Sequence, residues 1–283
     1  MALGIAALSV AGALAMANAQ QGPETREIIQ VKDNVYHYRS GLYNMVFAVT
    51  PDGVILVDTH NAEAAEWLKS ELKSRFNAEV KYLIYSHDHG DHISGGEVFA
   101  DTAVIIAHEQ AKADIIGDKR PTAVPDLTYK DTMTIELGGT VAELNFLGRS
   151  HSDNMTIVRF PKEGVVLAVD VVQMNSIGFG PYSDAYFPDF IDSLKRIEAM
   201  DFDIVIPGHG AQGDRSNVTA YRLYLEDLLG QVQTLVRAGK SLEEIQADVD
   251  LTKYKDWALY GFMRDANVAG MYSHITRNRI ANP

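Results

Sequence analysis

The sequence predicts a layered α/β fold, and three observations favour it. Short apolar runs rich in β-branched residues alternate with stretches of helical periodicity, turn residues separate them, and the pattern becomes entirely helical after Asn217. Strands that alternate with helices pack as sheets covered by helices around a shared core. No sequence period repeats and no shift in composition divides the chain, so we expect one domain over residues 24–283, with 217–283 mainly helical.

Eight apolar runs are the predicted strands, and turn residues bound each of them. In chain order they span residues 46–49, 54–57, 82–85, 104–107, 141–146, 155–160, 165–169 and 204–206. The turn Thr50-Pro51-Asp52-Gly53 joins the first two runs. This connection indicates a hairpin, because proline and glycine supply the backbone angles that a tight turn requires.

The predicted helices carry apolar residues three or four positions apart. Residues 62–76 and 189–200 each place such residues on one face. After Asn217 the same spacing continues through Val218, Tyr221, Leu225, Leu228, Val232 and Leu235. We interpret this last stretch as a packing face, and a partner-binding helix is the alternative.

Composition limits the classes of partner and cofactor. A chain of 283 residues buries about three quarters of its unfolded surface, which is enough for a self-sufficient core. The net charge of -13 argues against nucleic acid and against an anionic membrane surface, because Lys and Arg drive both kinds of binding. There is no cysteine, so disulfides, thiolate catalysis and Cys-containing zinc sites are excluded. Any metal must be held by histidine and carboxylate.

Residues 1–19 have the character of a secretory signal peptide. They are uncharged and apolar, and Ala17-Asn18-Ala19 has the small-x-small form of a cleavage site. The basic residue usual near the start is missing. An uncleaved anchor or a buried N-terminal helix are the alternatives. We expect a periplasmic or secreted protein without stable membrane association.

The strongest chemical signal is Ser86-His87-Asp88-His89-Gly90-Asp91-His92, directly after a predicted strand. His87 and His89 are two residues apart, so their rings point the same way if the strand conformation persists. Asp91 and His92 follow a glycine turn and can reach a second position nearby. Imidazoles with carboxylates suit a cation such as zinc, but two imidazoles do not complete a site.

The remaining ligands are expected where other strands end, because α/β sheets bind ligands beyond the carboxyl ends of their strands. His151, Asp170 and His209 each follow a predicted strand, and so does Asp58. A single Asp or His in such a place is usually a turn or cap residue. Their recurrence beside the histidine cluster favours metal binding by His151, Asp170 and His209, but not by Asp58.

These motifs resemble the metallo-β-lactamase-fold hydrolase superfamily. The resemblance rests on the His87-x-His89-x-Asp91-His92 motif with the glycines after it, then on His151, Asp170 and the Pro207-Gly208-His209-Gly210 turn, all in the expected order. It implies an αββα sandwich, here with a helical C-terminal extension, and a centre of two zinc ions at one edge of the sheets. Iron or manganese are alternatives.

The resemblance also implies a role for each ligand. One ion takes three imidazoles, from His87, His89 and His151. The other takes a carboxylate and two imidazoles, from Asp91, His92 and His209. Asp170 bridges the two ions. Asp58 orients the segment 86–92, which we call the ligand loop, through hydrogen bonds.

The implied reaction is hydrolysis of a small ester, lactone or amide. Two dications about 3.5 to 4 Å apart lower the pKa of a shared water toward 7, so hydroxide can attack the carbonyl. Asp91 orients this nucleophile and relays its proton. An exported β-lactamase is an alternative, although those enzymes usually have no carboxylate at the position of Asp170. A mononuclear iron dioxygenase with fewer ligands is another, and a non-catalytic metal protein a third.

The segment 177–187, just past Asp170, is rich in aromatic residues and glycine, which is typical of a mobile apolar pocket wall. Tyr182 or Tyr186 could donate a hydrogen bond to a developing oxyanion. The alternative is that these aromatic side chains pack the loop onto the helix that starts at Asp189. Asn154 either orients the ligand loop or is an ordinary turn residue. Tyr43, Asn44 and Met45 line the pocket or pack in the core.

Overall fold

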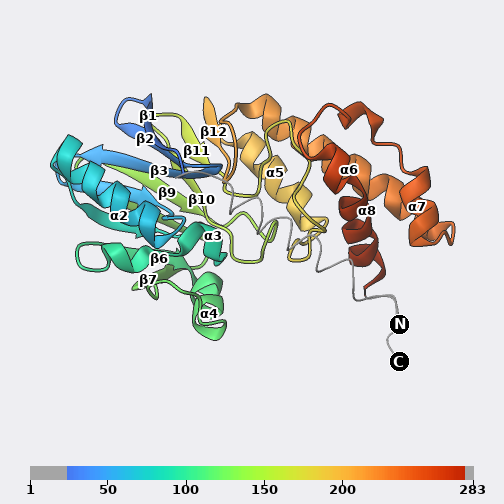
Figure 1. The fold of residues 1–283 in the computed structure, drawn as a ribbon, viewed down its shortest axis with the longest axis horizontal. Coiled ribbons are helices and arrows are strands. Elements are labelled where there is room, and N and C mark those ends of the chain that lie inside the picture. Colours follow the sequence, from blue (N-terminus) through green and yellow to red (C-terminus); the bar gives the residue numbers. More distant parts are fainter. Residues whose placement is uncertain (1–23, 278–283) are drawn as a thin grey trace.

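The computed structural model describes residues 24–277, which fold into two sheets with helices on both outer faces (Figure 1). The predicted αββα sandwich with a helical C-terminal extension is confirmed. The predicted signal peptide, residues 1–19, lies outside the described residues. Within residues 24–277, no helix combines the length and the apolar character that a membrane span requires.

The first sheet has seven strands in sequence order, antiparallel from β1 to β4 and parallel from β4 to β7. Its members are β1 (Arg26–Lys32), β2 (Val35–Ser40), β3 (Tyr43–Thr50), β4 (Gly53–Val57), β5 (Val80–Ile84), β6 (Val104–His108) and β7 (Leu127–Tyr129). The second sheet has the order β12-β11-β10-β9-β8. Its members are β8 (Thr132–Leu137), β9 (Thr140–Asn145), β10 (Ile157–Phe160), β11 (Val165–Leu167) and β12 (Ile204–Ile206).

The two faces of strand β4 pack into two different apolar clusters. Side chains alternate between the faces of a strand, so Ile55 and Val57 point into the cluster between the two sheets. Val54 and Leu56 point the other way, into the cluster under the outer helices. All five residues of β4 are buried, which explains why this strand is a continuous apolar run in the sequence.

The outer layers are helical. Helix α2 (Ala62–Glu71), a π-helical turn η1 (Leu72–Phe76) and α4 (Glu109–Gly117) belong to the first sheet's side, and Asn61 caps α2 through its side chain. A short α3 (Gly90–Ile93) and a 3₁₀ turn η2 (Gly96–Phe99) follow β5. Helix α5 (Asp189–Ala199) packs with the second sheet in one apolar cluster.

The C-terminal extension consists of α6 (Arg215–Arg237), α7 (Leu242–Asp248), η3 (Thr252–Tyr254) and α8 (Tyr260–Thr276). Helix α6 begins at Arg215 because Asp214 and Asn217 form a capping box there. Val218, Tyr221, Leu225, Leu228 and Val232 are buried, and Leu235 is half-buried against the same cluster. The predicted packing face of this helix is therefore confirmed.

Candidate metal centre

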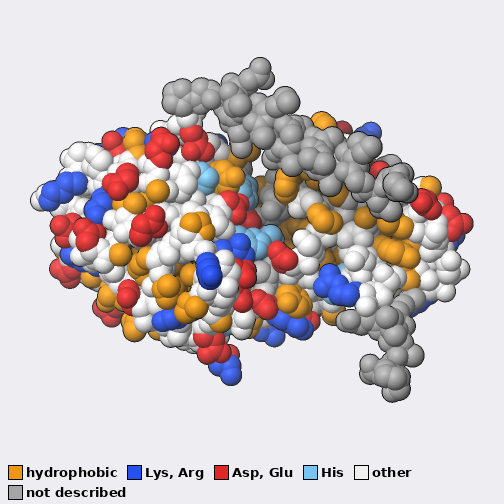
Figure 2. Space-filling model, turned by 60° about the horizontal axis from the view of Figure 1, so that its bottom comes forward, with side chains coloured by type: hydrophobic (Ala, Val, Ile, Leu, Met, Phe, Trp, Pro, Cys, Tyr) orange, Lys and Arg blue, Asp and Glu red, His pale blue; other side chains and the backbone are white. Residues whose placement is uncertain are grey.

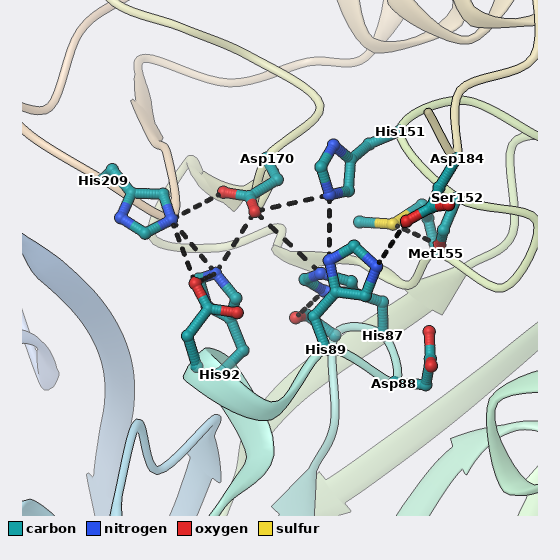
Figure 3. Close-up of polar contacts among 12 residues, drawn as sticks. His87, Asp88, His89, His92, His151, Ser152, Met155, Asp170, Asp184 and His209 are labelled. Atoms are coloured by element: carbon teal, nitrogen blue, oxygen red, sulfur yellow. Dashed lines mark hydrogen bonds and ion pairs between the residues drawn. The ribbon is translucent and has the colours of Figure 1, made fainter. Parts of the chain in front are cut away.

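The seven predicted ligands meet at one edge of the sandwich, although they come from both sheets (Figure 3). The loop after β5 and helix α3 carry His87, His89, Asp91 and His92 in the first sheet. His151 lies after β9, Asp170 after β11 and His209 after β12, all in the second sheet. Strands β11 and β12 run parallel to each other, so their carboxyl ends bring Asp170 and His209 to the same edge.

The first group contains His87, His89, His151 and Asp170. Nδ1 of His89 lies 3.2 Å from Nε2 of His151. Oδ2 of Asp170 lies 3.5 Å from Nε2 of His151 and 3.9 Å from Nε2 of His87. Around a tetrahedral zinc ion with bonds near 2.0–2.1 Å, ligand atoms are about 3.3 Å apart, so these spacings suit one ion.

The second group contains Asp91, His92 and His209. The two Nε2 atoms of His92 and His209 are 3.2 Å apart, and Oδ2 of Asp91 lies 3.6 Å and 3.7 Å from them. Asp170 also reaches this group, with Oδ1 at 3.2 Å from His209 and Oδ2 at 3.3 Å from His92. The carboxylate of Asp170 thus lies between the two groups.

Two buried atoms of the first group support binding of a cation. Nε2 of His87 and Oδ1 of Asp170 make no hydrogen bond of acceptable geometry within residues 24–277. Unsatisfied buried polar atoms are uncommon because they cost free energy. An ion in the first group would satisfy Nε2 of His87, and an ion in the second group would satisfy Oδ1 of Asp170, so the donor set fits zinc.

Burial and neighbouring charges shift the pKa values of three candidate ligands. Burial, together with the neighbouring imidazoles, holds the pKa of His87 well below its usual range, so its ring is neutral. Burial alone would raise the pKa of Asp170, but the surrounding imidazoles hold it well below its usual range. Burial acts to lower the pKa of His92, yet Asp170, Asp91 and Asp58 together raise it to about 9. His92 therefore releases a proton when it binds a metal ion.

Asp58 belongs to neither ligand group. It is fully buried, its Oδ1 accepts a hydrogen bond of 2.8 Å from the backbone N–H of Ser86, and its Oδ2 lies 3.7 Å from Nδ1 of His92. Burial raises the pKa of Asp58 to about 6. The carboxylate contacts the start of the ligand loop and the side of His92 that faces away from His209, which suits an orienting role.

Asn154 contacts the ligand loop through Asp88. Its Oδ1 accepts a 3.2 Å hydrogen bond from the backbone N–H of Asp88, and its Nδ2 donates to Oδ1 of Asp88 and to Oδ2 of Asp114, both at 2.9 Å. Arg120 donates to the other oxygen of Asp88 at 2.8 Å. These contacts favour the orienting interpretation of Asn154. Arg120 lies 32 residues from Asp88, and no pattern in the sequence connects the two.

The two predicted oxyanion donors differ in position. The hydroxyl of Tyr182 accepts from the N–H of Gly178 at 3.1 Å and donates to Oδ1 of Asn267 at 3.1 Å, and the residue is half-buried against the apolar cluster of the second sheet. Its hydroxyl proton is thus engaged within the protein, and the alternative, packing of the loop, describes this residue. The hydroxyl of Tyr186 is more open, at 3.4 Å from Asp153. Tyr186 thus remains a candidate donor.

Asn44 fixes the turn that carries His209. Its Nδ2 donates to the carbonyl oxygens of Pro207 and Gly210, both at 2.9 Å, and its backbone N–H donates to Gly208 at 2.9 Å. Gly208 itself has no room for a side chain, because a Cβ there would overlap Oδ1 of Asp170 and lie 2.9 Å from the ring of His92. Of the two interpretations of Asn44, burial in the core applies, with a positioning contact added.

The ring of Tyr43 lies at the edge of the second group. It stacks on His60 with ring centroids 3.8 Å apart and meets His209 edge-on at 4.9 Å. Nδ1 of His60 lies 2.9 Å from the backbone oxygen of Asp91. His60 is thus beside the ligands without belonging to either ligand group.

Asp184 is a residue of the site that the sequence analysis missed. Its Oδ2 lies 3.3 Å from Nε2 of His89, on the ring side opposite to the atom that faces His151 (Figure 3). A single Asp in an irregular aromatic loop carries no pattern that could have identified it.

Comparison with known proteins identifies the class and the family. Residues 39–209 match the family described as the metallo-beta-lactamase superfamily. This match covers more than half of the chain and includes all seven candidate ligands, so the protein is a metal-dependent hydrolase. It belongs to the metallo-β-lactamase superfamily.

Similar proteins differ in their named activities. The chain is 26% identical over 240 residues to the 2,4-dinitroanisole O-demethylase subunit alpha of Nocardioides sp. (strain JS1661), which covers 83% of this chain and 70% of the relative. It is 24% identical to the metallo-beta-lactamase type 2 of Elizabethkingia meningoseptica, with 84% of this chain and 96% of the relative covered.

The solved structures support the fold. The metallo-beta-lactamase from Pontibacter korlensis matches with a TM-score of 0.63 and 23% identity, covering 69% of this chain and 96% of that chain. The DIM-1 metallo-beta-lactamase matches with a TM-score of 0.65 and 22% identity, covering 72% and 97%. Each of these structures thus leaves about three tenths of this chain unmatched. The family match ends at residue 209, before α6.

Proposed function

We propose that this protein is a dinuclear zinc hydrolase that cleaves a small ester, lactone or amide. The observation that carries the proposal is the pair of ligand groups, each compact enough for one ion, with the carboxylate of Asp170 between them. His87, His89 and His151 would hold one ion, and Asp91, His92 and His209 the other. Bound zinc would supply an acidified water as nucleophile and positive charge to polarise the substrate carbonyl.

The chain's own residues orient these groups and move the proton. Asp91 is the most exposed ligand carboxylate, with 44% of its side chain accessible, so it can contact both the second group and a water at the opening. We assign to Asp91 the orientation of that water and the acceptance of its proton. Asp58 and Asn154 hold the ligand loop by accepting hydrogen bonds from its backbone N–H groups. Tyr186 is the candidate donor to the developing oxyanion.

The substrate class follows from the charge of the centre. A carboxylate at Asp170 in addition to Asp91 lowers the net positive charge that two zinc ions provide, which weakens attraction of anionic substrates. The second ligand group is complete, which supports a dinuclear hydrolase over a mononuclear iron dioxygenase.

A β-lactamase is the second candidate, because several relatives carry that name. The relative named as an O-demethylase adds activated aryl ethers to the bonds worth testing.

The test combines metal analysis with an activity panel. Purified protein is expected to contain two zinc ions per chain and to hydrolyse lactones or aryl esters faster than cephalosporins and phosphodiesters. Asp91→Ala should lower kcat by about 100-fold or more while the protein stays folded by circular dichroism. The matched control is Asp192→Ala, which removes an exposed carboxylate on α5. Full activity of the Asp91 variant would contradict the proposed proton transfer.

We also propose that the protein is exported and acts in the periplasm or outside the cell. The support is the apolar segment 1–19 with its small-residue cleavage site. N-terminal sequencing of protein expressed from the full gene should give a chain that begins at Gln20. A chain that keeps residues 1–19 in the cytosol would contradict export.

A further inference from the structure

The imidazole of His89 has a different partner at each ring nitrogen. Nδ1 faces His151 at 3.2 Å within the first ligand group, and Nε2 faces the carboxylate of Asp184 at 3.3 Å. When Nδ1 points its lone pair at an ion, Nε2 carries the ring proton, on the side where Asp184 lies. The position of Asp184 therefore suits the tautomer of His89 that can bind metal.

The carboxylate of Asp184 is also accessible from solvent. Its side chain is 61% exposed, while that of His89 is 22% exposed. Within residues 24–277, Asp184 has no ion pair with lysine or arginine. Figure 2 shows acidic side chains beside the exposed histidines, with a basic side chain on one side.

The arginines of the neighbouring segments are already paired. Arg149 is bound to Asp189 at 2.7 Å, and Arg120 is bound to Asp88 at 2.8 Å and to Asp118 at 3.2 Å. These pairings leave the negative charge of Asp184 uncompensated by basic side chains of the described chain. A molecule that approaches the first ligand group meets this charge.

The loop that carries Asp184 is held from the C-terminal extension. Nδ2 of Asn267 on α8 donates to the carbonyl oxygens of Gly178 and Gly180, at 2.9 and 2.7 Å. Gly270 allows α8 to approach the same loop, since a Cβ there would overlap the carbonyl oxygen of Pro181. Asp184 is thus placed by helix contacts and by its own contact with His89.

We propose that Asp184 is a positioning and specificity-determining residue, which orients His89 and favours substrates with a cationic group near the scissile carbonyl. This inference rests on the proposed hydrolase function and names the substrate class more narrowly: neutral or cationic esters, lactones and amides. Substrates with a carboxylate near the reacting bond, which include the β-lactam antibiotics, are disfavoured because the carboxylate of Asp184 would repel them.

The test measures binding of three small thiols to the zinc-loaded protein by titration calorimetry. They share a metal-binding sulfur and differ in charge: (2-mercaptoethyl)trimethylammonium, 2-mercaptoethanol and 2-mercaptoethanesulfonate. In wild type the cationic thiol should bind most tightly. Asp184→Asn should shift the ratio of the cationic to the anionic Kd by about tenfold toward the anion, and less at high ionic strength.

Two control variants separate local from general charge effects. Asp184→Glu should keep the wild-type preference, and Asp192→Asn, which removes an exposed charge on α5, should leave the ratio unchanged. Differences in thiol acidity cancel, because each variant is compared with wild type using the same probes. An unchanged ratio in Asp184→Asn would overturn the specificity assignment, and so would failure of all three thiols to bind wild type.

A second readout addresses the positioning role. Competition with a chromophoric chelator should show that Asp184→Asn weakens binding at one zinc site by about 10-fold, with the other site little changed. Equal zinc affinity in Asp184→Asn and wild type would overturn it. If the thiol ratio and zinc affinity shift as expected but no ester, lactone or amide is hydrolysed, the proposed function fails while the role of Asp184 stands.

Discussion

The side-chain amide of Asn267 on α8 donates a hydrogen bond to the carbonyl oxygen of Gly180, 2.7 Å away. This contact joins a helix of the C-terminal extension to the loop beside the candidate metal centre. Asn267 is fully buried, and its Oδ1 accepts from Tyr182 and from Tyr224, at 3.1 and 2.7 Å. One amide thereby satisfies four partners, three in the loop 178–182 and one on α6.

Replacement of this amide should destabilise the protein. Asn267→Leu leaves two carbonyl oxygens and two hydroxyls without their partner in a buried place, so the free energy of unfolding should fall by about 2–4 kcal/mol. Hydrogen exchange of residues 178–187 should become faster. Chemical denaturation and exchange mass spectrometry check this, with Gln233→Leu, a half-buried amide on α6, as control. Unchanged exchange in the loop would show that α8 does not hold it.

Two tyrosine substitutions should affect different properties, one the stability of the protein and the other its kcat. Tyr182→Phe removes a half-buried hydroxyl with several partners, so it should cost about 1–2 kcal/mol of stability and leave kcat within about twofold. Tyr186→Phe should leave stability unchanged. If Tyr186 donates to the oxyanion, kcat falls by about 10-fold or more. Steady-state kinetics and thermal melts on both variants decide this, and a large kcat loss in Tyr182→Phe would restore it as a donor.

Asp58→Asn should weaken metal binding without removing a ligand. The amide can still accept from the N–H of Ser86, but it no longer offers a charged oxygen to Nδ1 of His92. We expect zinc affinity at the second group to fall by about 10–100-fold. Chelator competition fitted to two sites measures this. Equal affinities at both sites for the variant and wild type would assign Asp58 a purely structural role.

Zinc removal should lower the melting temperature, because the ligands come from the strand ends of both sheets. At free zinc about 1,000 times the Kd, each site adds about 4 kcal/mol to the unfolding free energy. Differential scanning calorimetry in zinc buffers should therefore show a melting temperature that rises with free zinc. The Asp170→Asn variant should lose most of this dependence. A melting temperature independent of zinc would argue against any bound ion.

Much of the fold was predictable because burial leaves a pattern. Strand β4 is fully apolar because both of its faces are buried. The apolar residues of α6 are three or four positions apart because one face of this helix is buried. The strands β1, β2, β7 and β8 were not predicted. β1 and β8 carry polar residues at several half-exposed or exposed positions, so their apolar pattern is weak. Helix α4 was missed for the same reason, since only Ala111 and Ile115 of it are buried.

The site was predictable to the extent that its residues have distinctive types and places. Histidines at the ends of strands are few, so the sequence alone was enough to propose seven candidate ligands, which the fold brings together in two groups. Residues that act by contact left no such signal. Arg120, Asp184 and Asn267 belong to common types in segments far from the ligands they support, and only the folded chain brings them together.

Gly208 offers no ligand and no hydrogen-bonding side chain, yet the carboxylate of Asp170 and the ring of His92 occupy the space where its side chain would be. Even alanine there would push apart two side chains that we propose share an ion. In a saturation library selected for activity, position 208 should tolerate replacement as poorly as the histidines do. Such a screen would therefore identify position 208 as essential because it has no side chain, and not because it supplies a chemical group.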